Sequence, residues 1–395
     1  MYLTSFVHRD DLFKITERWL CDRLHPHDAL SVTKILICDG YIAGKTIETV
    51  TGLLLERICD KPFRMERINF KGELRDVMCR NCWETTPRVA ELVSRYQNNP
   101  DFFYREAPVN GVICRDKYDR LVGQFRIKRP RRIAEKANRY IANWIFGMVQ
   151  NQAQTMAEER AHQMGLPLQW LLTPPQEMET EFKTAEGAIA QGFREGAINL
   201  DRAALTIHDV AGIKIVAKPE ALSRLEASLL DDPMITVVAR ENHAGNYNAT
   251  SLILSVPWDK ESICREYMES TAWENYLDRG IPAADLARGL APLVENAEPA
   301  INIELILSTF PDMVESELGN SIHEERIIAQ RDNKIYKGYI PMNVEFLIEY
   351  LFHVGFSPRI RLASLPIRLW GRYLPDTMTS CFRQLYNIPE YDFFL

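Results

Sequence analysis

The sequence predicts an α+β protein, a mixed sheet with helices packed on it, and three patterns carry that prediction. Four short segments after residue 209 are apolar and rich in β-branched residues, as buried strands are; they span 210–217, 235–239, 250–256 and 301–307. A helical pattern with proline in its first turn starts at Pro130 and runs toward residue 165. From residue 343 onward the chain is mostly helical and aromatic.

These elements divide the chain into three parts. Residues 1–110 are expected to form a separate α/β unit, with a helix at 10–24, a buried strand at 33–38 and a helical stretch at 46–57. Asn98, Asn99 and Pro100 mark its end. Residues 111–335 would form the core that carries the sheet, interrupted by a helical insertion at 140–200, and residues 336–395 would form a C-terminal helical region.

Charge and composition limit the classes of function. The chain has 395 residues, 46% of them apolar, and a net charge of −7, which argues against nucleic-acid binding over the whole surface. Between Arg115 and Arg139, however, ten Lys or Arg residues stand against three acids. This local excess predicts either an anion-binding site or a solvated helix face.

Cysteine use and hydropathy predict a cytoplasmic protein. The eight cysteines include a single CxxC pair, Cys79 and Cys82, whereas a structural zinc site needs four ligands. Reduced thiols at this density suit a reducing cytosol. The N-terminal segment lacks the apolar run of a signal peptide, and no stretch reaches the roughly 18 apolar residues of a membrane span. We therefore expect neither a zinc site nor a membrane partner.

Two acidic residues stand where an acid is costly. Glu304 interrupts the apolar segment 301–307, and Asp209 immediately precedes the segment 210–217. A buried carboxylate needs a cation, a metal or a proton, and two strand-borne acids that face one cleft can hold Mg²⁺ against nucleotide phosphates. The alternative is that Glu304 points to solvent from an edge strand.

The basic segment supplies the complementary charges. Arg126 and Lys128 share one face if the chain is extended there, and Arg132 and Lys136 share one face of the helix that follows. Arginine forms forked bonds to phosphate and lysine adds a point charge, which is the mixture that a triphosphate needs. A solvated basic helix is the alternative interpretation.

The order of these motifs resembles the synthetase domain of the RelA/SpoT family. That family carries R-x-K…S-I-x-x-K, D-x-x-x-I-R, G-Y-x-S-x-H, I-E-I-Q-I-R-T and E-Y-G-x-x-A-H-W in this order. This chain has RIKRPRRIAEK at 126–136, DVAGIK at 209–214, NYNATS at 246–251, IELILST at 303–309 and ELGNSIH at 317–323. The resemblance covers residues 123–326 and includes no match to the hydrolase domain of the family's long members.

The resemblance implies a Mg²⁺-dependent enzyme that transfers pyrophosphate from ATP to the ribose 3′-hydroxyl of an acceptor nucleotide, GDP or GTP above all. Its product would be a (p)ppGpp-like alarmone of the stringent response. The catalytic and metal-binding residues would be Asp209 and Glu304. The ATP phosphates would be bound by Arg126, Lys128, Arg132 and Lys136. The acceptor would be bound by Tyr247, which would stack on its base, and by His323, Lys214 and His243.

The sequence departs from the family mainly on the acceptor side. Ser251 replaces a histidine, Ile306 and Ser308 replace a glutamine and an arginine, and Lys214 replaces an arginine. The acceptor could therefore be an adenine nucleotide instead. Two further alternatives stay open, namely a toxin-like relative that pyrophosphorylates tRNA, which the local basic excess favours, and a catalytically degenerate nucleotide sensor. Self-association into an oligomer also stays open.

A second signal lies near the N-terminus. Residues 34–50, KILICDGYIAGKTIETV, resemble the ribose-phosphate loop of phosphoribosyltransferases, V-D-D-V-I-A-T-G-K-T. The matching positions are Asp39, Gly44, Lys45 and Thr46. A strand followed by a glycine turn and a helix N-terminus would cradle a phosphate. The alternative is a plain β-turn-α unit without a ligand.

Overall fold

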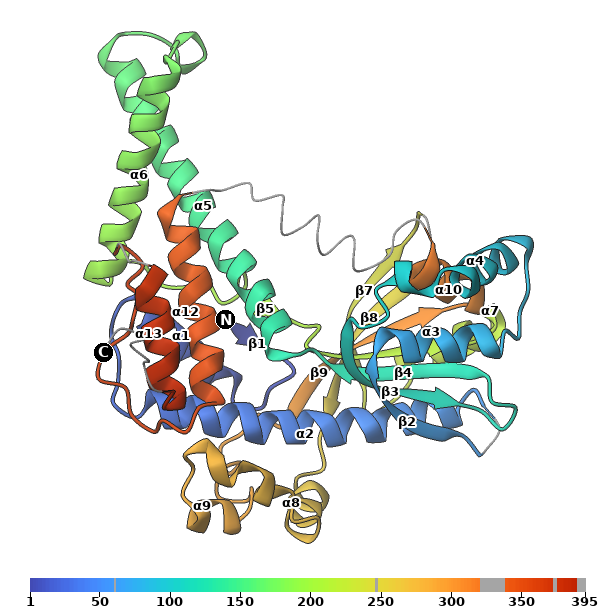
Figure 1. The fold of residues 1–395 in the computed structure, drawn as a ribbon. Helices are drawn as coiled ribbons and strands as arrows, with labels where there is room; N and C mark the ends of the chain where they lie inside the picture. The colour runs from blue at the N-terminus through green and yellow to red at the C-terminus, as the bar shows by residue number, and fades with distance from the viewer. Residues whose placement is uncertain (60–61, 246–247, 320–337, 372–374, 389–395) are drawn as a thin grey trace, which may run out of the picture.

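The fold is built on one seven-stranded mixed sheet, in the order β2-β3-β4-β6-β9-β8-β7 (Figure 1). We describe a computed structural model that covers residues 1–59, 62–245, 248–319, 338–371 and 375–388. The sheet strands are β2 (Arg64–Phe70), β3 (Pro108–Arg115), β4 (Leu121–Ile127), β6 (Ala211–Val216), β7 (Thr236–His243), β8 (Ala249–Pro257) and β9 (Ala300–Ser308). Neighbouring strands are antiparallel except for β6 and β9, which are parallel. A separate parallel pair joins β1 (Tyr2–Leu3) to β5 (Thr206–Ile207).

The α+β class that the sequence predicts is confirmed. The four predicted strands correspond to β6, β7, β8 and β9. The sheet also contains β2, β3 and β4, so it crosses the boundary that we expected near residue 110, which falls inside β3. The hairpin of β3 and β4 was not predicted, because charged residues interrupt its apolar alternation at Arg115, Arg120 and Arg126.

One face of the sheet is covered by α2 (Asp28–Glu56) and α7 (Pro219–Leu230). The second half of α2 packs beneath β4 and β6, where Ile42, Ile47 and Leu54 are buried against Ile213 and Ile215. Two shorter helices, α8 (Lys260–Glu269) and α9 (Ala283–Ala287), lie on the far side of α2 from the sheet (Figure 1). This packing holds the central strands in place from their apolar face. The same strands carry polar side chains on the opposite face.

The strand predicted at 33–38 is wrong, and with it the phosphate loop. All of 33–46 lies inside the continuous helix α2. Asp39 is buried against His8, Lys45 forms an ion pair with Glu266, and the Thr46 hydroxyl donates to the carbonyl of Ile42 in the preceding helical turn. No glycine turn and no helix N-terminus exists there, so these residues cannot cradle a phosphate.

The other face of the sheet is covered at one end by α3 (Lys71–Arg80), α4 (Pro87–Asn98) and α10 (Phe310–Leu318). Glu317 of α10 is buried, and its carboxylate accepts hydrogen bonds from Lys71 at 2.8 Å and from Arg75 at 3.3 Å. Burial alone would raise the pKa of Glu317, but the charges of Lys71 and Arg75 outweigh it and hold the pKa well below its usual range. This buried pair attaches α3 to the helix that follows β9.

A helical layer stands beside the sheet. It contains α1 (Arg9–Leu20), the first half of α2, α5 (Pro130–Gln163), α6 (Pro175–Glu195), α12 (Tyr339–Gly355) and α13 (Pro375–Tyr386). The hairpin of α5 and α6 projects far from the rest of the molecule (Figure 1). At its tip, Trp170 and Leu172 are 66% and 93% exposed. The helical insertion and the helical C-terminal region thus have the predicted secondary structure, although α5 already begins at Pro130.

The Glu317 pair leads to a prediction for pH-dependent stability. Replacing Glu317 with Gln removes the buried negative charge that Lys71 and Arg75 both contact, so the free energy of unfolding at pH 7 should fall by about 3–5 kcal/mol. Because the folded-state pKa is depressed, the carboxylate stabilises the wild type above its unfolded pKa, and that stabilisation is lost as pH falls. Urea titrations of both proteins from pH 7 to pH 3 should therefore converge. Glu179→Gln, at an exposed pair with Lys183, is the control and should change nothing. Parallel curves at all pH values would contradict the assignment.

Two helical glycines make a matched pair for testing the contact between α12 and α2. A Cβ at Gly355 would overlap the Leu36 side chain and lie 3.1 Å from Val32 Cγ1, whereas one at Gly147 would meet nothing within 4 Å. Gly355→Ala should lower the free energy of unfolding by about 1–3 kcal/mol because it overpacks the core. Gly147→Ala should raise it by up to about 1 kcal/mol, since alanine is the better helix former. Equal effects in urea unfolding would show that the two helices are not closely packed.

Candidate functional site

Two lysines and an aspartate meet where β4 leaves the sheet. β4 ends at Ile127, Lys128 follows directly, and Lys136 lies in the second turn of α5, which Pro130 starts. Asp209 lies in the segment that enters β6, beside β4. The Nζ atoms of Lys128 and Lys136 are 2.7 Å and 2.6 Å from the same oxygen, Asp209 Oδ2. Lys128 also donates to the Asp209 carbonyl, so this lysine binds both main chain and side chain.

The charges of this group are strongly coupled. Burial alone would raise the pKa of Asp209, but the charges and hydrogen bonds of Lys128 and Lys136 outweigh it and lower the pKa to about 2. Burial also lowers the pKa of Lys128, and the charges of Asp209 and Glu304 restore part of it. The second carboxylate oxygen, Asp209 Oδ1, is buried and has no hydrogen-bond partner among the described residues. Asp209 is thus ionised with one oxygen still lacking a partner.

Glu304 lies on the same polar face of the sheet, from a central strand. β9 pairs with β6 on one side and β8 on the other, so the interpretation of Glu304 as an edge-strand residue is wrong. Glu304 is in register with Gly212 of β6, which is in register with Arg126 of β4. Ser251 of β8 donates to Glu304 Oε1 at 3.3 Å. A Cβ at Gly212 would lie 3.6 Å from Glu304 Oε2, so the Glu304 carboxylate lies beside this glycine.

Lys214 links this face to the buried Glu317 cluster. It lies two residues beyond Gly212 on β6, and its Nζ is 3.5 Å from Ser316 Oγ of α10. Burial lowers the pKa of Lys214 to about 8, with Glu317 acting in the opposite direction and Lys71 in the same one. The side chain is therefore oriented toward the α10 end of the sheet rather than toward Asp209.

The remaining predicted site residues have different outcomes. Arg132 forms an ion pair with Glu135 on its own helix, so it does not join the Asp209 group in this structure. His243 lies at the end of the edge strand β7 and is 3.8 Å from Glu241. Tyr247 and His323 lie outside the described residues. The structure therefore brings together Lys128, Lys136 and Asp209, with Arg126 and Glu304 on adjoining strands of the same face.

Sequence reasoning missed the N-terminal segment, whose Thr4 and Ser5 contact the chain next to Asp209 and Glu304. The buried Ser5 hydroxyl donates to the Asn302 carbonyl at 2.7 Å and accepts from the Ala211 amide at 3.2 Å. Thr4 Oγ1 lies 3.2 Å from Nδ1 of His208, the residue before Asp209. Ser5 thereby links the starts of β6 and β9, at positions two residues away from Asp209 and Glu304. No local pattern could reveal contacts between residues separated by about 200 positions or more.

The residues of this site fit a hard divalent cation. Mg²⁺ prefers carboxylate oxygens and keeps bound phosphate and water as its other ligands. Asp209 Oδ1 is the buried, unpartnered oxygen that such an ion would take, and Glu304 is the second carboxylate on the same face. Elsewhere in the described part of the chain, the cysteines of the CxxC pair are free thiols, and Cys79 is buried in α3.

Comparison with known proteins gives limited similarity. No protein-family model matches the sequence, and no curated protein matches it. Among solved structures, the chain is similar to small alarmone synthetase 2 from Bacillus subtilis at 14% identity and a TM-score of 0.20, with 43% of this chain and 71% of that chain covered.

Two further solved structures are those of small alarmone synthetase 1 from the same organism. The first has 12% identity and a TM-score of 0.21, with 72% of this chain and 92% of that chain covered. The other, bound to its product pppGpp, has 11% identity and a TM-score of 0.17, with 47% and 70% covered. Sequence identities and TM-scores this low do not assign a function to this chain. No helix in the described ranges has the length and hydropathy that crossing a membrane requires.

Proposed function

We propose that this chain is a Mg²⁺-dependent pyrophosphokinase that transfers the pyrophosphoryl group of ATP to the ribose 3′-hydroxyl of an acceptor nucleotide, GDP or GTP in the first instance. The observation that carries the proposal is the group of Lys128, Lys136 and Asp209, which lies beside Glu304 on one face of a mixed sheet. Two carboxylates and a set of cations are what positioning a triphosphate requires.

The roles follow from the charges. Bound Mg²⁺ would neutralise the phosphate oxygens and polarise the group that is transferred. Asp209 would bind the ion through Oδ1, while Lys128, Lys136 and Arg126 would bind phosphate oxygens. Here both lysines contact Asp209; with ATP and the ion bound, phosphate would replace the carboxylate as partner of the lysines. The site therefore keeps its cations in place with an internal counter-charge until a substrate replaces it.

Glu304 is the residue that we propose to act on the acceptor. Its carboxylate would orient the 3′-hydroxyl and accept its proton as the oxygen bonds to the β-phosphorus of ATP. The bond from that phosphorus to the α–β bridging oxygen then breaks, and AMP leaves with the electron pair. Ser251, which already donates to Glu304 Oε1, would hold the carboxylate in place. Lys214 and His243 remain proposed contacts to the acceptor.

The structure weighs on the tRNA alternative as well. Several cations between residues 115 and 139 form ion pairs. Arg115 pairs with Glu66 and Asp119, and Arg120 pairs with Asp116. Arg131 and Arg132 both pair with Glu135. Of these acids only Glu66 lies outside the segment, so the local excess of positive charge persists and can attract an RNA backbone. We rank a nucleotide acceptor first because Lys128 and Lys136 converge on Asp209, and we keep tRNA as an arm of the test.

The first experiment measures the reaction. The purified chain, Mg²⁺ and γ-labelled ATP are incubated with GDP, GTP, AMP, ADP or bulk tRNA, and the products are separated. Label transferred to GDP or GTP is the expected outcome. Label on tRNA, lost steeply as salt is raised, would replace the nucleotide acceptor with RNA. Bound ATP without a labelled product from any acceptor would favour the nucleotide sensor. The uncharged residues Ser251 and Ile306 beside Glu304 also favour that alternative.

Variants separate binding from chemistry. Glu304→Gln should lower kcat by at least about 100-fold with little change in ATP affinity, since the lost group acts on the acceptor. Lys136→Gln should instead weaken ATP binding about tenfold, because it removes a charge-assisted contact to phosphate. Glu241→Gln, an exposed glutamate on β7, is the control and should match the wild type in both readouts. Full transfer activity in Glu304→Gln would disprove its proposed role.

A further inference from the structure

A second group of cations surrounds a cavity beside α1 and the first half of α2. The cavity has a volume of about 300 Å³ and lies between α1 and the first half of α2, with Leu293 closing one side. Its lining is His8, Asp11, Lys14, Ile15, Arg18, Ser31, Lys34, Ile35, Cys38 and Leu293. None of the residues assigned to the pyrophosphokinase site is among them.

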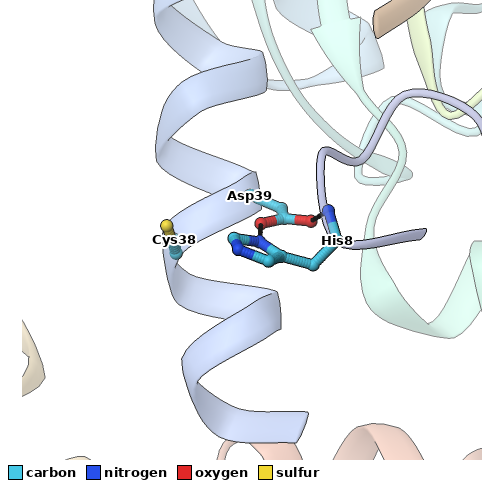
Figure 2. A group of neighbouring side chains, drawn as sticks. All are labelled: His8, Cys38 and Asp39. Carbon is cyan, nitrogen blue, oxygen red and sulfur yellow. Dashed lines mark hydrogen bonds and ion pairs between the residues drawn. The ribbon is translucent and has the colours of Figure 1, made fainter. Parts of the chain in front are cut away.

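His8 and Cys38 line this cavity, and together with Asp39 they are close enough to one another to suggest a metal site (Figure 2). The hydrogen bonds argue against a metal. His8 Nδ1 is 2.6 Å from Asp39 Oδ1, and His8 Nε2 is 2.7 Å from the carbonyl of Leu293. Both ring nitrogens therefore face acceptors and act as donors, which leaves neither of them free to bind an ion.

The same contacts favour the protonated form of His8. Burial alone would lower the pKa of His8, but the hydrogen bond and charge of Asp39 outweigh it and raise the pKa. The His8 backbone amide also donates to Asp39 Oδ2 at 2.8 Å, so the carboxylate is held by two donors from one residue. Burial raises the pKa of the Cys38 thiol well above its ordinary value, and the thiol stays neutral. His8 and Cys38 thus give the cavity no metal-binding set, and Asp39 offsets the charge of protonated His8.

The walls add further donors, each only partly used. Arg18 donates from Nη2 to the buried Asp28, Lys34 lies 3.3 Å from Asp285, and Lys14 lies 3.9 Å from Asp11. An ammonium has three donors and a guanidinium five, so each side chain retains N–H groups after its carboxylate is satisfied. Of the four acids named as partners of these cations and of His8, only Asp11 lines the cavity, whereas all four cations do. The cavity surface is therefore rich in donors and poor in acceptors.

We propose that this cavity is a second ligand site, for a small phosphate-bearing anion. Phosphate oxygens would take the spare donors of Lys14, Arg18 and Lys34, and Ser31 would add a hydroxyl. The apolar walls of Ile15, Ile35 and Leu293 suit the uncharged part of such a molecule. The site does not depend on the pyrophosphokinase assignment, because it shares no residue with it.

The position of the cavity connects it to the two carboxylates of the other site. His8 lies three residues after Ser5, which binds both Ala211 and Asn302 at the starts of β6 and β9. The next residue, Arg9, donates to the carbonyls of Thr4 and Ala300. A ligand held against His8 would therefore contact the segment that supports Asp209 and Glu304.

Calorimetric titration of the whole chain with inorganic pyrophosphate, without Mg²⁺, tests the site by its stoichiometry. The wild type should bind one molecule per chain, in the cavity, because without the ion Asp209 remains the partner of Lys128 and Lys136. Lys14→Gln combined with Lys34→Gln should bind none, or should bind it at least about tenfold more weakly. Failure of the pyrophosphokinase proposal leaves these counts unchanged, so the two failures are distinguishable. ADP and inorganic phosphate, titrated in parallel, decide whether the ligand is a nucleotide or a free phosphate.

Lys183→Gln is the matched control, since Lys183 is 69% exposed and pairs with an acid one turn away, as Lys14 does at 64%. Lys14→Gln alone, at an exposed position, keeps the test valid should the double variant unfold, and it should weaken the cavity site by about threefold. Identical stoichiometry and affinity in the wild type and both cavity variants would overturn the proposal.

Discussion

The structure depends on one helix that belongs to two hydrophobic cores. In its first half, α2 buries Val32 and Leu36 against the helical layer. In its second half, the same helix buries Ile42, Ile47 and Leu54 against the sheet. A helix of 29 residues that is buried on different faces along its length cannot move relative to either core without exposing apolar surface. One candidate site lies on the sheet that this helix supports, and the other is lined by the first half of the helix itself.

The two faces of the sheet have opposite chemistry for a physical reason. Along β6 and β9, residues alternate between a buried apolar face on α2 and a half-buried face that carries Lys214 and Glu304. Because successive side chains of a strand point to opposite faces, the same strands can carry an apolar face and a charged face. The charged face is tolerable because its buried carboxylates have cationic partners: Glu317 binds Lys71 and Arg75 at one end, and Asp209 binds Lys128 and Lys136 at the other.

The sequence predicted the parts of this arrangement that local spacing determines. Local spacing places Lys128 after an extended segment and Lys136 in the second turn of a helix started by proline, but it does not show that both meet Asp209, which lies 81 and 73 positions away. Arg132 was placed on the same helix face, but Glu135, three residues away, binds it instead. The run at 33–38 predicts a strand because its last four residues are all apolar, and a helix that is buried on both sides shows no helical periodicity over so short a segment. Contacts such as Ser5 with Asn302 join residues 297 positions apart and leave no local signal.

The α5–α6 hairpin has a mechanical consequence. The first half of α5 is held in the helical core by Ile133, Ile141 and Ile145 and also carries Lys136, whereas the far end projects from the molecule. A helix of 34 residues is about 50 Å long, so a force of a given size at the distal end acts on the base through a long lever arm. Contact at that end would therefore be felt as torque at the lysine that holds Asp209, although the two are separated by most of the length of the helix.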